Sequence, residues 1–366
     1  MVGSMSFLIS LRVLRVDTGR KKGMLELCKE EYACVVEYQA FFNLETKDPG
    51  REPKGNRKIM NREGKTEDLT EMETAVATVA LSANAGISIT FGGKRIWVDA
   101  LHKAPAGTPD GYSHVTPEMW QQMQSDDAFA DPDIICFTHL HPDHYSEEMM
   151  LQAATTYSKA GLILPEGIST LNGKPKTQNG RPNTLLLTGR QVVLRSDDLT
   201  MRFVRLPHEG AHYRDVVMYG LILSAGGKSI LIGSDCETAS ERLIDFLQSG
   251  LKSQLDLKQS PELQSDVRID LAILPFPWIT LRKGRAFLEE RLQPKHLFLY
   301  HLPFEEDDIN GYREATQRAL RDYAPAQTSD QTQAIDRSQA PSPSQAPYLS
   351  DIRLLDTPMQ KESVML

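Results

Sequence analysis

The stretch Thr138-His139-Leu140-His141-Pro142-Asp143-His144-Tyr145 holds three histidines and an aspartate within six positions. It follows the apolar run 133–137 (Asp-Ile-Ile-Cys-Phe), which predicts a short buried β-strand that the Pro-Asp pair ends in a loop. Neutral imidazole and carboxylate are usual ligands of zinc. The alternation in 139–141 points both imidazoles to one side of an extended backbone, and Asp143 and His144 come from the turn that follows. The stretch therefore predicts a metal site.

Three further ligand-type residues follow predicted strands elsewhere in the chain. His208 comes after the run 203–207, Asp235 after 230–234 and His301 after 297–300. Because side chains from several elements can converge where strands end, we expect these three residues to join the same site.

His212, four residues after His208, is a rival for the same coordination position. We prefer His208 as the metal ligand because it directly follows the strand. His212 is then a candidate for contact with the substrate.

The order of the predicted elements indicates the fold class. Gly92-Gly93 joins two β-type runs, 86–91 and 94–99, and Ala225-Gly226-Gly227 joins another pair, which predicts two hairpins. Predicted helices lie between the later strands. Strands and helices alternate in two consecutive blocks, which indicates an α/β sandwich with helices on its outer faces.

Changes in composition divide the chain into three parts. We expect residues 1–70 to be a poorly defined and partly disordered N-terminal extension, residues 71–323 to be the compact domain, and residues 324–366 to be a disordered tail. The tail prediction follows from its Gln, Ser and Pro content, with too few apolar residues to bury.

Composition also limits the partners. The chain has 366 residues and a formal net charge of −8, so no nucleic acid is expected. The cysteines Cys28, Cys34, Cys136 and Cys236 form no CxxC pair, which favours free thiols in a reducing compartment. The apolar N-terminus is broken by arginines and is too short for a membrane span, so no membrane is expected and the cytoplasm is the predicted location.

The ordered ligand set resembles the metal-binding signature of the metallo-β-lactamase fold superfamily over roughly residues 75–320. The pieces around Asp235, 270–275 and 294–301 look most like the L-ascorbate-6-phosphate lactonase-like branch, although Ser234-Asp235-Cys236 stands where many relatives have Gly-Asp-Thr. The resemblance implies a four-layer αββα sandwich, with residues 71–323 as the catalytic domain.

The resemblance also implies a division of the ligands between two Zn²⁺ ions, with Mn²⁺ or Fe²⁺ as other divalent metals. One ion would be held by His139, His141 and His208, the second by Asp143, His144 and His301, and both by Asp235. Asp99, at the end of a predicted strand, resembles the acidic residue that supports the ligand loop, and such support fixes imidazole orientation.

The function implied is a zinc-dependent hydrolase that uses a metal-bridged hydroxide to cleave a small ester, lactone or phosphoester. Asp143 and His212 are the predicted catalytic residues, and the predicted partner is a small, anionic substrate, with self-association left open. An iron-dependent oxidoreductase on the same fold, a metal-dependent nuclease and a non-catalytic relative are the alternatives. Intact His-x-His-x-Asp-His favours zinc, because the di-iron branch typically has Glu at the second histidine.

Overall fold

The computed structural model describes residues 76–104, 111–168, 183–196, 198–248, 269–323 and 351–366. Outside these ranges it describes the backbone of short strands, namely β1 (Leu11–Val13), β2 (Val35–Gln39), β3 (Lys58–Met60), β4 (Thr66–Asp68), β10 (Thr170–Leu171) and β11 (Lys174–Pro175).

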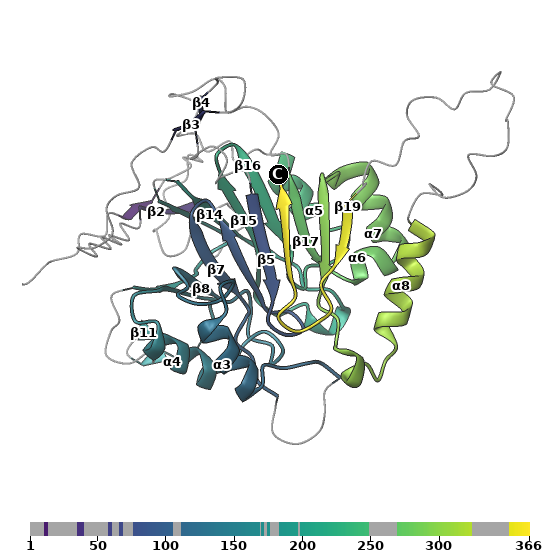
Figure 1. The fold of residues 1–366 in the computed structure, drawn as a ribbon, viewed down its shortest axis with the longest axis horizontal. Coiled ribbons are helices and arrows are strands. Elements are labelled where there is room, and N and C mark those ends of the chain that lie inside the picture. Colours follow the sequence, from purple (N-terminus) through teal and green to yellow (C-terminus); the bar gives the residue numbers. More distant parts are fainter. Residues whose placement is uncertain are drawn as a thin grey trace, which may run out of the picture.

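The first large sheet has the strand order β12-β9-β8-β7-β6-β5-β20 (Figure 1). β5, β6 and β7 pair antiparallel, whereas β7, β8, β9 and β12 pair parallel. Both glycines of the Gly92-Gly93 turn have positive φ, as a two-residue hairpin turn between β6 and β7 requires. The strands are β5 (Val76–Leu81), β6 (Ile87–Phe91), β7 (Lys94–Val98), β8 (Ile134–Cys136), β9 (Gly161–Leu164), β12 (Thr184–Leu186) and β20 (Lys361–Met365).

The second large sheet repeats this plan, with the order β1-β2-β13-β14-β15-β16-β17-β18-β19. Strands β13 to β16 pair antiparallel, and β16 to β19 pair parallel. The repetition explains why the sequence divides into two consecutive blocks. The strands are β13 (Gln191–Arg195), β14 (Thr200–Leu206), β15 (Met218–Ala225), β16 (Lys228–Ile232), β17 (Leu271–Pro275), β18 (His296–Tyr300) and β19 (Asp351–Leu354).

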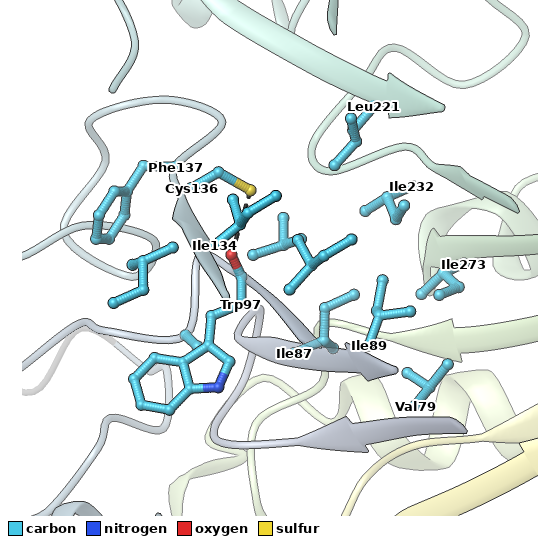
Figure 2. Packing of buried hydrophobic residues seen from close by; sticks show 14 of the residues in the cluster. Val79, Ile87, Ile89, Trp97, Ile134, Cys136, Phe137, Leu221, Ile232 and Ile273 are labelled. Carbon is cyan, nitrogen blue, oxygen red and sulfur yellow. Dashed lines mark hydrogen bonds between the residues drawn. The ribbon is translucent and has the colours of Figure 1, made fainter. Parts of the chain in front are cut away.

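The two sheets pack face to face around an apolar interior. Successive residues on a strand point to opposite faces. On β15, Leu221 and Leu223 therefore belong to the cluster between the sheets, whereas Ile222 belongs to a second cluster on the outer face. Figure 2 shows this interior with Val79, Ile87, Ile89, Leu221, Ile232 and Ile273.

Helices cover both outer faces of the sandwich (Figure 1). α3 (Pro117–Ser125) and α4 (Glu147–Thr156) add Trp120 and Met150 to the first cluster, and the ring of Trp120 lies 6.3 Å from that of Trp97 on β7. The second cluster is completed by α5 (Glu241–Gln248), α6 (Pro277–Thr280), α7 (Arg282–Phe287) and α8 (Tyr312–Tyr323). The layers therefore run helix, sheet, sheet, helix, which confirms the predicted αββα sandwich.

Two of the four cysteines lie among the described residues. Cys136 and Cys236 are buried and free, and the thiol of Cys136 donates to the carbonyl of Trp97 at 3.2 Å (Figure 2). Both behave as small buried apolar residues. Cys28 and Cys34 lie outside the described part of the chain.

The prediction of a disordered tail over 324–366 is wrong for its last part. β19 pairs parallel with β18, and β20 pairs antiparallel with β5, so residues 351–366 add an edge strand to each sheet. Leu355, Val364 and Leu366 are buried there. The Gln, Ser and Pro content that suggested disorder belongs to residues 324–350, which lie outside the described part.

Most of the predicted extension 1–70 also lies outside the described residues. Within it, β2 pairs parallel with β13 and β1 pairs antiparallel with β2, so the second sheet includes strands from a region that we assigned to an extension. Among the described helices, none is long and apolar enough to cross a membrane.

Candidate metal centre

The ligand-type residues gather at one rim of the sandwich. The loop 138–145 follows β8, His208 follows β14, Asp235 follows β16 and His301 follows β18. The N–H of Glu209 donates to the carbonyl of Asp235 at 2.8 Å, which ties two of these loops together. The strand ends therefore bring these residues together, as predicted.

The ligand atoms form two groups that share one carboxylate, and a third group joins Asp99 to His139 and His144. Within each group the atoms lie within 4.8 Å of one another. The grouping agrees with the division of ligands that the resemblance implied. One group is His139, His141, His208 and Asp235, and the other is Asp143, His144, Asp235 and His301.

Asp235 stands between the two groups. Its Oδ2 lies 3.4 Å from Nε2 of His208 and 3.2 Å from Nε2 of His144. Its Oδ1 lies 3.0 Å from Nε2 of His301. One carboxylate thus reaches ring nitrogens of both groups, which is the position of a bridging ligand.

Asp99 fixes the orientation of His144. Nδ1 of His144 lies 2.9 Å from Oδ2 of Asp99, whose Oδ1 accepts the N–H of Thr138 at 2.7 Å. An ionised carboxylate only accepts hydrogen bonds, so Nδ1 of His144 carries a proton. Nε2 of His144 is then the ring atom that faces Asp143 and Asp235, at 3.6 Å and 3.2 Å.

Two more imidazoles are oriented in the same way. Nδ1 of His208 donates to the carbonyl of Glu209 at 2.7 Å. The hydroxyl of Thr138 donates to Asp99 at 2.6 Å, so it can only accept from Nδ1 of His139, which lies at 3.0 Å. Nε2 of His139 is therefore unprotonated, and it is buried without a hydrogen-bond partner among the described residues.

This arrangement fits metal ions. Ring nitrogens of five histidines and two carboxylates converge in a largely buried space, and two carboxylates in such a place are unfavourable unless positive charge lies between them. A divalent ion would also satisfy Nε2 of His139. Imidazole nitrogen with carboxylate oxygen suits zinc, iron and manganese. The fold and the site thus define an αββα sandwich protein with a candidate centre for divalent metal.

The electrostatics of the side chains point the same way. Burial lowers the pKa of His301, but the carboxylates of Asp235 and Asp143 outweigh burial and raise the pKa to about 9. Burial also lowers the pKa of His144, and the same two carboxylates raise it well above its ordinary value. At His139, burial and the neighbouring His144 lower the pKa well below its ordinary value. The carboxylates therefore favour a cation at the second group.

Unusual backbone conformations accompany the site. Asp99, Ser234 and His301 have φ values of 52°, 49° and 66°, in the left-handed region that such residues rarely adopt. The hydroxyl of Ser234 lies 2.8 Å from that of Thr138, so it belongs to the same hydrogen-bonded network. Strain of this kind persists only where the surrounding contacts impose it, and it concentrates at functional sites.

His212 lies outside this network. It is exposed on the short 3₁₀ helix η1 (Ala211–Tyr213) and belongs to neither ligand group, so His208 occupies the coordination position. Contact between His212 and a substrate stays a prediction. The neighbouring Tyr213 reaches the site instead, with its ring centroid 5.0 Å from that of His141 and 4.8 Å from that of His208.

Sequence reasoning missed Asn84 and Tyr112, which approach the second ligand group. Nδ2 of Asn84 donates to Oδ2 of Asp143 at 3.3 Å. The ring centroid of Tyr112 lies 5.8 Å from that of His301. The only sequence signal for Asn84 was the run of small residues between two predicted strands, and Tyr112 had none.

No protein-family model and no curated protein matches the sequence. Among solved structures, a metallo hydrolase from the archaeon Ignicoccus hospitalis is 14% identical over 80% of this chain and 99% of its own, with a TM-score of 0.47. The metallo-β-lactamase fold protein YhfI from Bacillus subtilis is 11% identical over 79% and 99%, with a TM-score of 0.44. CmlA, a diiron β-hydroxylase from Streptomyces venezuelae, is 13% identical over 79% and 54%, with a TM-score of 0.41. These distant likenesses concern the fold and carry no function.

Proposed function

We propose that this chain is a metal-dependent hydrolase that cleaves a small ester, lactone or phosphoester. It would use two divalent ions, of which zinc is our first choice. The observation that carries the proposal is the pair of ligand groups that share Asp235. Asp99, Thr138 and Glu209 orient the imidazoles of these groups before any ion binds. Preorientation of this kind raises metal affinity and is characteristic of functional metal sites.

The side chains would hold the ions and manage protons. Two divalent ions supply a water molecule activated near neutral pH and a Lewis acid for the substrate oxygen. Oδ2 of Asp143 contacts Asn84, His144 and His301, whereas its Oδ1 takes part in none of these contacts. Asp143 would therefore offer Oδ2 to an ion, while Oδ1 is left to accept a hydrogen bond from a nucleophilic water molecule, which is the orienting role predicted for it.

The proposed substrate is a small anion. Bound divalent ions would place positive charge at the site, although the chain is acidic overall, with a net charge of −8. The half-buried His141 and the exposed Tyr213 mark the side from which a small molecule can reach the ions. In its specific form, the proposal is that the chain is a cytoplasmic, lactonase-like enzyme. His212 would contact the substrate.

Metal analysis combined with a substrate panel tests the proposal. We expect mass spectrometry of the purified chain to give two zinc ions per chain. We expect turnover of a lactone, ester or phosphoester. A chelator should abolish this turnover, added zinc should restore it, and the D143A substitution should remove it. Stoichiometric iron with a visible absorption band would replace the hydrolase by the oxidoreductase. A chain that binds no divalent metal would overturn both.

A further inference from the structure

The turn between β5 and β6, residues Ser82–Gly86, packs directly against the strand end that carries Asp99. A Cβ on Gly86 would lie 2.8 Å from Cα of Ala100 and 2.9 Å from the carbonyl oxygen of Asp99, so only glycine permits this approach. The turn closes on itself, because the N–H of Ser82 donates to the carbonyl of Gly86 at 2.8 Å. It is therefore a fixed element beside the metal centre.

Asn84, at the tip of this turn, contacts two ligands of the second group. Its Nδ2 donates to Oδ2 of Asp143 at 3.3 Å, and its backbone carbonyl accepts the N–H of His301 at 3.1 Å. The carboxylate of Asp143 can only accept, so the amide must face it with the NH₂ group. Asp143 and His301 occur in the second group alone.

The first group has no such contact. Among the described residues, no hydrogen bond joins Asn84 to His139, His141 or His208. Those imidazoles are oriented by other partners, as His208 is by the carbonyl of Glu209. Any effect of the Asn84 side chain on metal binding should therefore be confined to the second ion.

The left-handed turn accounts for Asn84 in part, because asparagine adopts this conformation more often than most residues other than glycine. Its φ of 40° is left-handed, which glycine would adopt at lower cost. The residue is completely buried, and its Oδ1 has no hydrogen-bond partner among the described residues. A buried unsatisfied acceptor is unfavourable and calls for a functional reason. The buried amide is therefore the feature that the turn does not explain.

We propose that Asn84 is a positioning residue for the second metal ion. Its side-chain NH₂ group donates to the carboxylate of Asp143, and its backbone carbonyl accepts the N–H of His301. Both ligands would then be held facing the position of the second ion. The inference rests on the proposed function, because it assumes that two ions bind.

Zinc titration of metal-free protein by calorimetry, with bound zinc counted by mass spectrometry, tests the inference. N84G keeps the left-handed backbone and removes the amide. N84D keeps the shape but sets a carboxylate against that of Asp143. For both variants we expect zinc affinity at the second site to fall about 10–100-fold, the usual effect of removing a ligand's supporting partner. The first site should be unchanged.

The control is N183G, which removes an amide that donates to the carbonyl of Lys159 away from the centre.

Each outcome separates the inference from the proposed function. If N84G binds two zinc ions with wild-type affinities, or loses affinity equally at both sites, the inference is overturned and the binuclear site stands. If the wild-type chain binds fewer than two ions, the inference about Asn84 and the proposed binuclear site are both wrong. If N84D fails to fold, N84G decides, because its backbone needs no rearrangement.

Discussion

Oδ2 of Asp99 accepts a hydrogen bond from Nδ1 of His144 at 2.9 Å, and both side chains are completely buried. The same carboxylate accepts from the backbone and the hydroxyl of Thr138. Asp99 therefore sets the tautomer of His144 directly and that of His139 through Thr138. One carboxylate that lies outside the two groups sharing Asp235 thus orients an imidazole in each of them.

The D99N substitution should disturb both groups. An amide nitrogen that faces Nδ1 of His144 would place the imidazole proton on Nε2, where it blocks a metal ion. We expect zinc affinity to fall about 10–100-fold, measured by competition with a chromophoric chelator. D131N is the matched control, because Asp131 is exposed and also has a left-handed φ, of 53°. Unchanged zinc affinity in folded D99N would show that Asp99 has no role in orienting the ligands.

Replacing each of two neighbouring histidines tests which one binds metal. H208A removes a buried ring that lies 3.1 Å from Nδ1 of His141 and 3.4 Å from Asp235, so we expect loss of bound zinc and of turnover. H212A removes an exposed ring outside both ligand groups, so its zinc content should equal that of the wild type. A rise in KM for H212A at unchanged zinc content would support its role as a substrate contact. Zinc loss in H212A but not in H208A would reverse the assignment.

The stability of the metal-free chain should fall as pH rises above neutrality. Burial lowers the pKa of His301, but Asp235 and Asp143 raise it from the ordinary value of 6.5 to about 9. A raised folded-state pKa contributes stability that is complete below about 6.5 and is lost as pH rises through about 9. Urea unfolding in the presence of a chelator between pH 6.5 and 9.5 measures this.

The zinc-loaded chain is the control for this pH dependence. Its ligands are already unprotonated, so its free energy of unfolding should not follow the same fall. A chelated chain whose stability is level or rises across the window would contradict the charge interactions that we describe around His301.

Arg353, which lies on β19, should hold the two C-terminal strands together. Its guanidinium donates to Asp351 on β19 and, at 3.1 Å and 2.9 Å, to the Glu362 carboxylate and the Ser363 carbonyl on β20. It also lies 5.3 Å from the centre of the Phe298 ring. We expect R353M to lower the free energy of unfolding by about 1–2 kcal/mol, because several charged hydrogen bonds are lost from a partly exposed site.

R318M is the matched control for R353M. Arg318 pairs with Glu314 one helical turn away, and both side chains are largely exposed, so the change should stay within about 0.5 kcal/mol. Equal effects of the two substitutions in urea unfolding would show that the contacts of Arg353 add nothing beyond an exposed pair.

Local chemistry accounts for what the sequence predicted well. The loop 138–145 is recognisable because its ligand-type side chains are adjacent in the chain, directly after an apolar strand. The hairpin at Gly92-Gly93 is equally local, since the turn conformation depends on the glycines themselves. His208, Asp235 and His301 were found because each ends a predicted strand, and strand ends meet at one rim.

Non-local pairing explains what the sequence reading missed. The strands within 351–366 are short and follow a Gln, Ser and Pro-rich region, and they gain their order only from pairing with β18 and β5. Asn84 carries no motif, and its contact with Asp143 joins residues that are 59 positions apart.

The amino-acid sequence alone therefore establishes the ligand types and the strands that carry them, because residue chemistry and apolar patterning are properties of adjacent positions. The folded structure adds that His208 and not His212 joins the ligands, that Asp235 reaches both groups, and that Asp99 sets the tautomer of His144. These facts depend on distances of about 3 Å between loops from different strands, and only the packing of the two sheets brings those loops together.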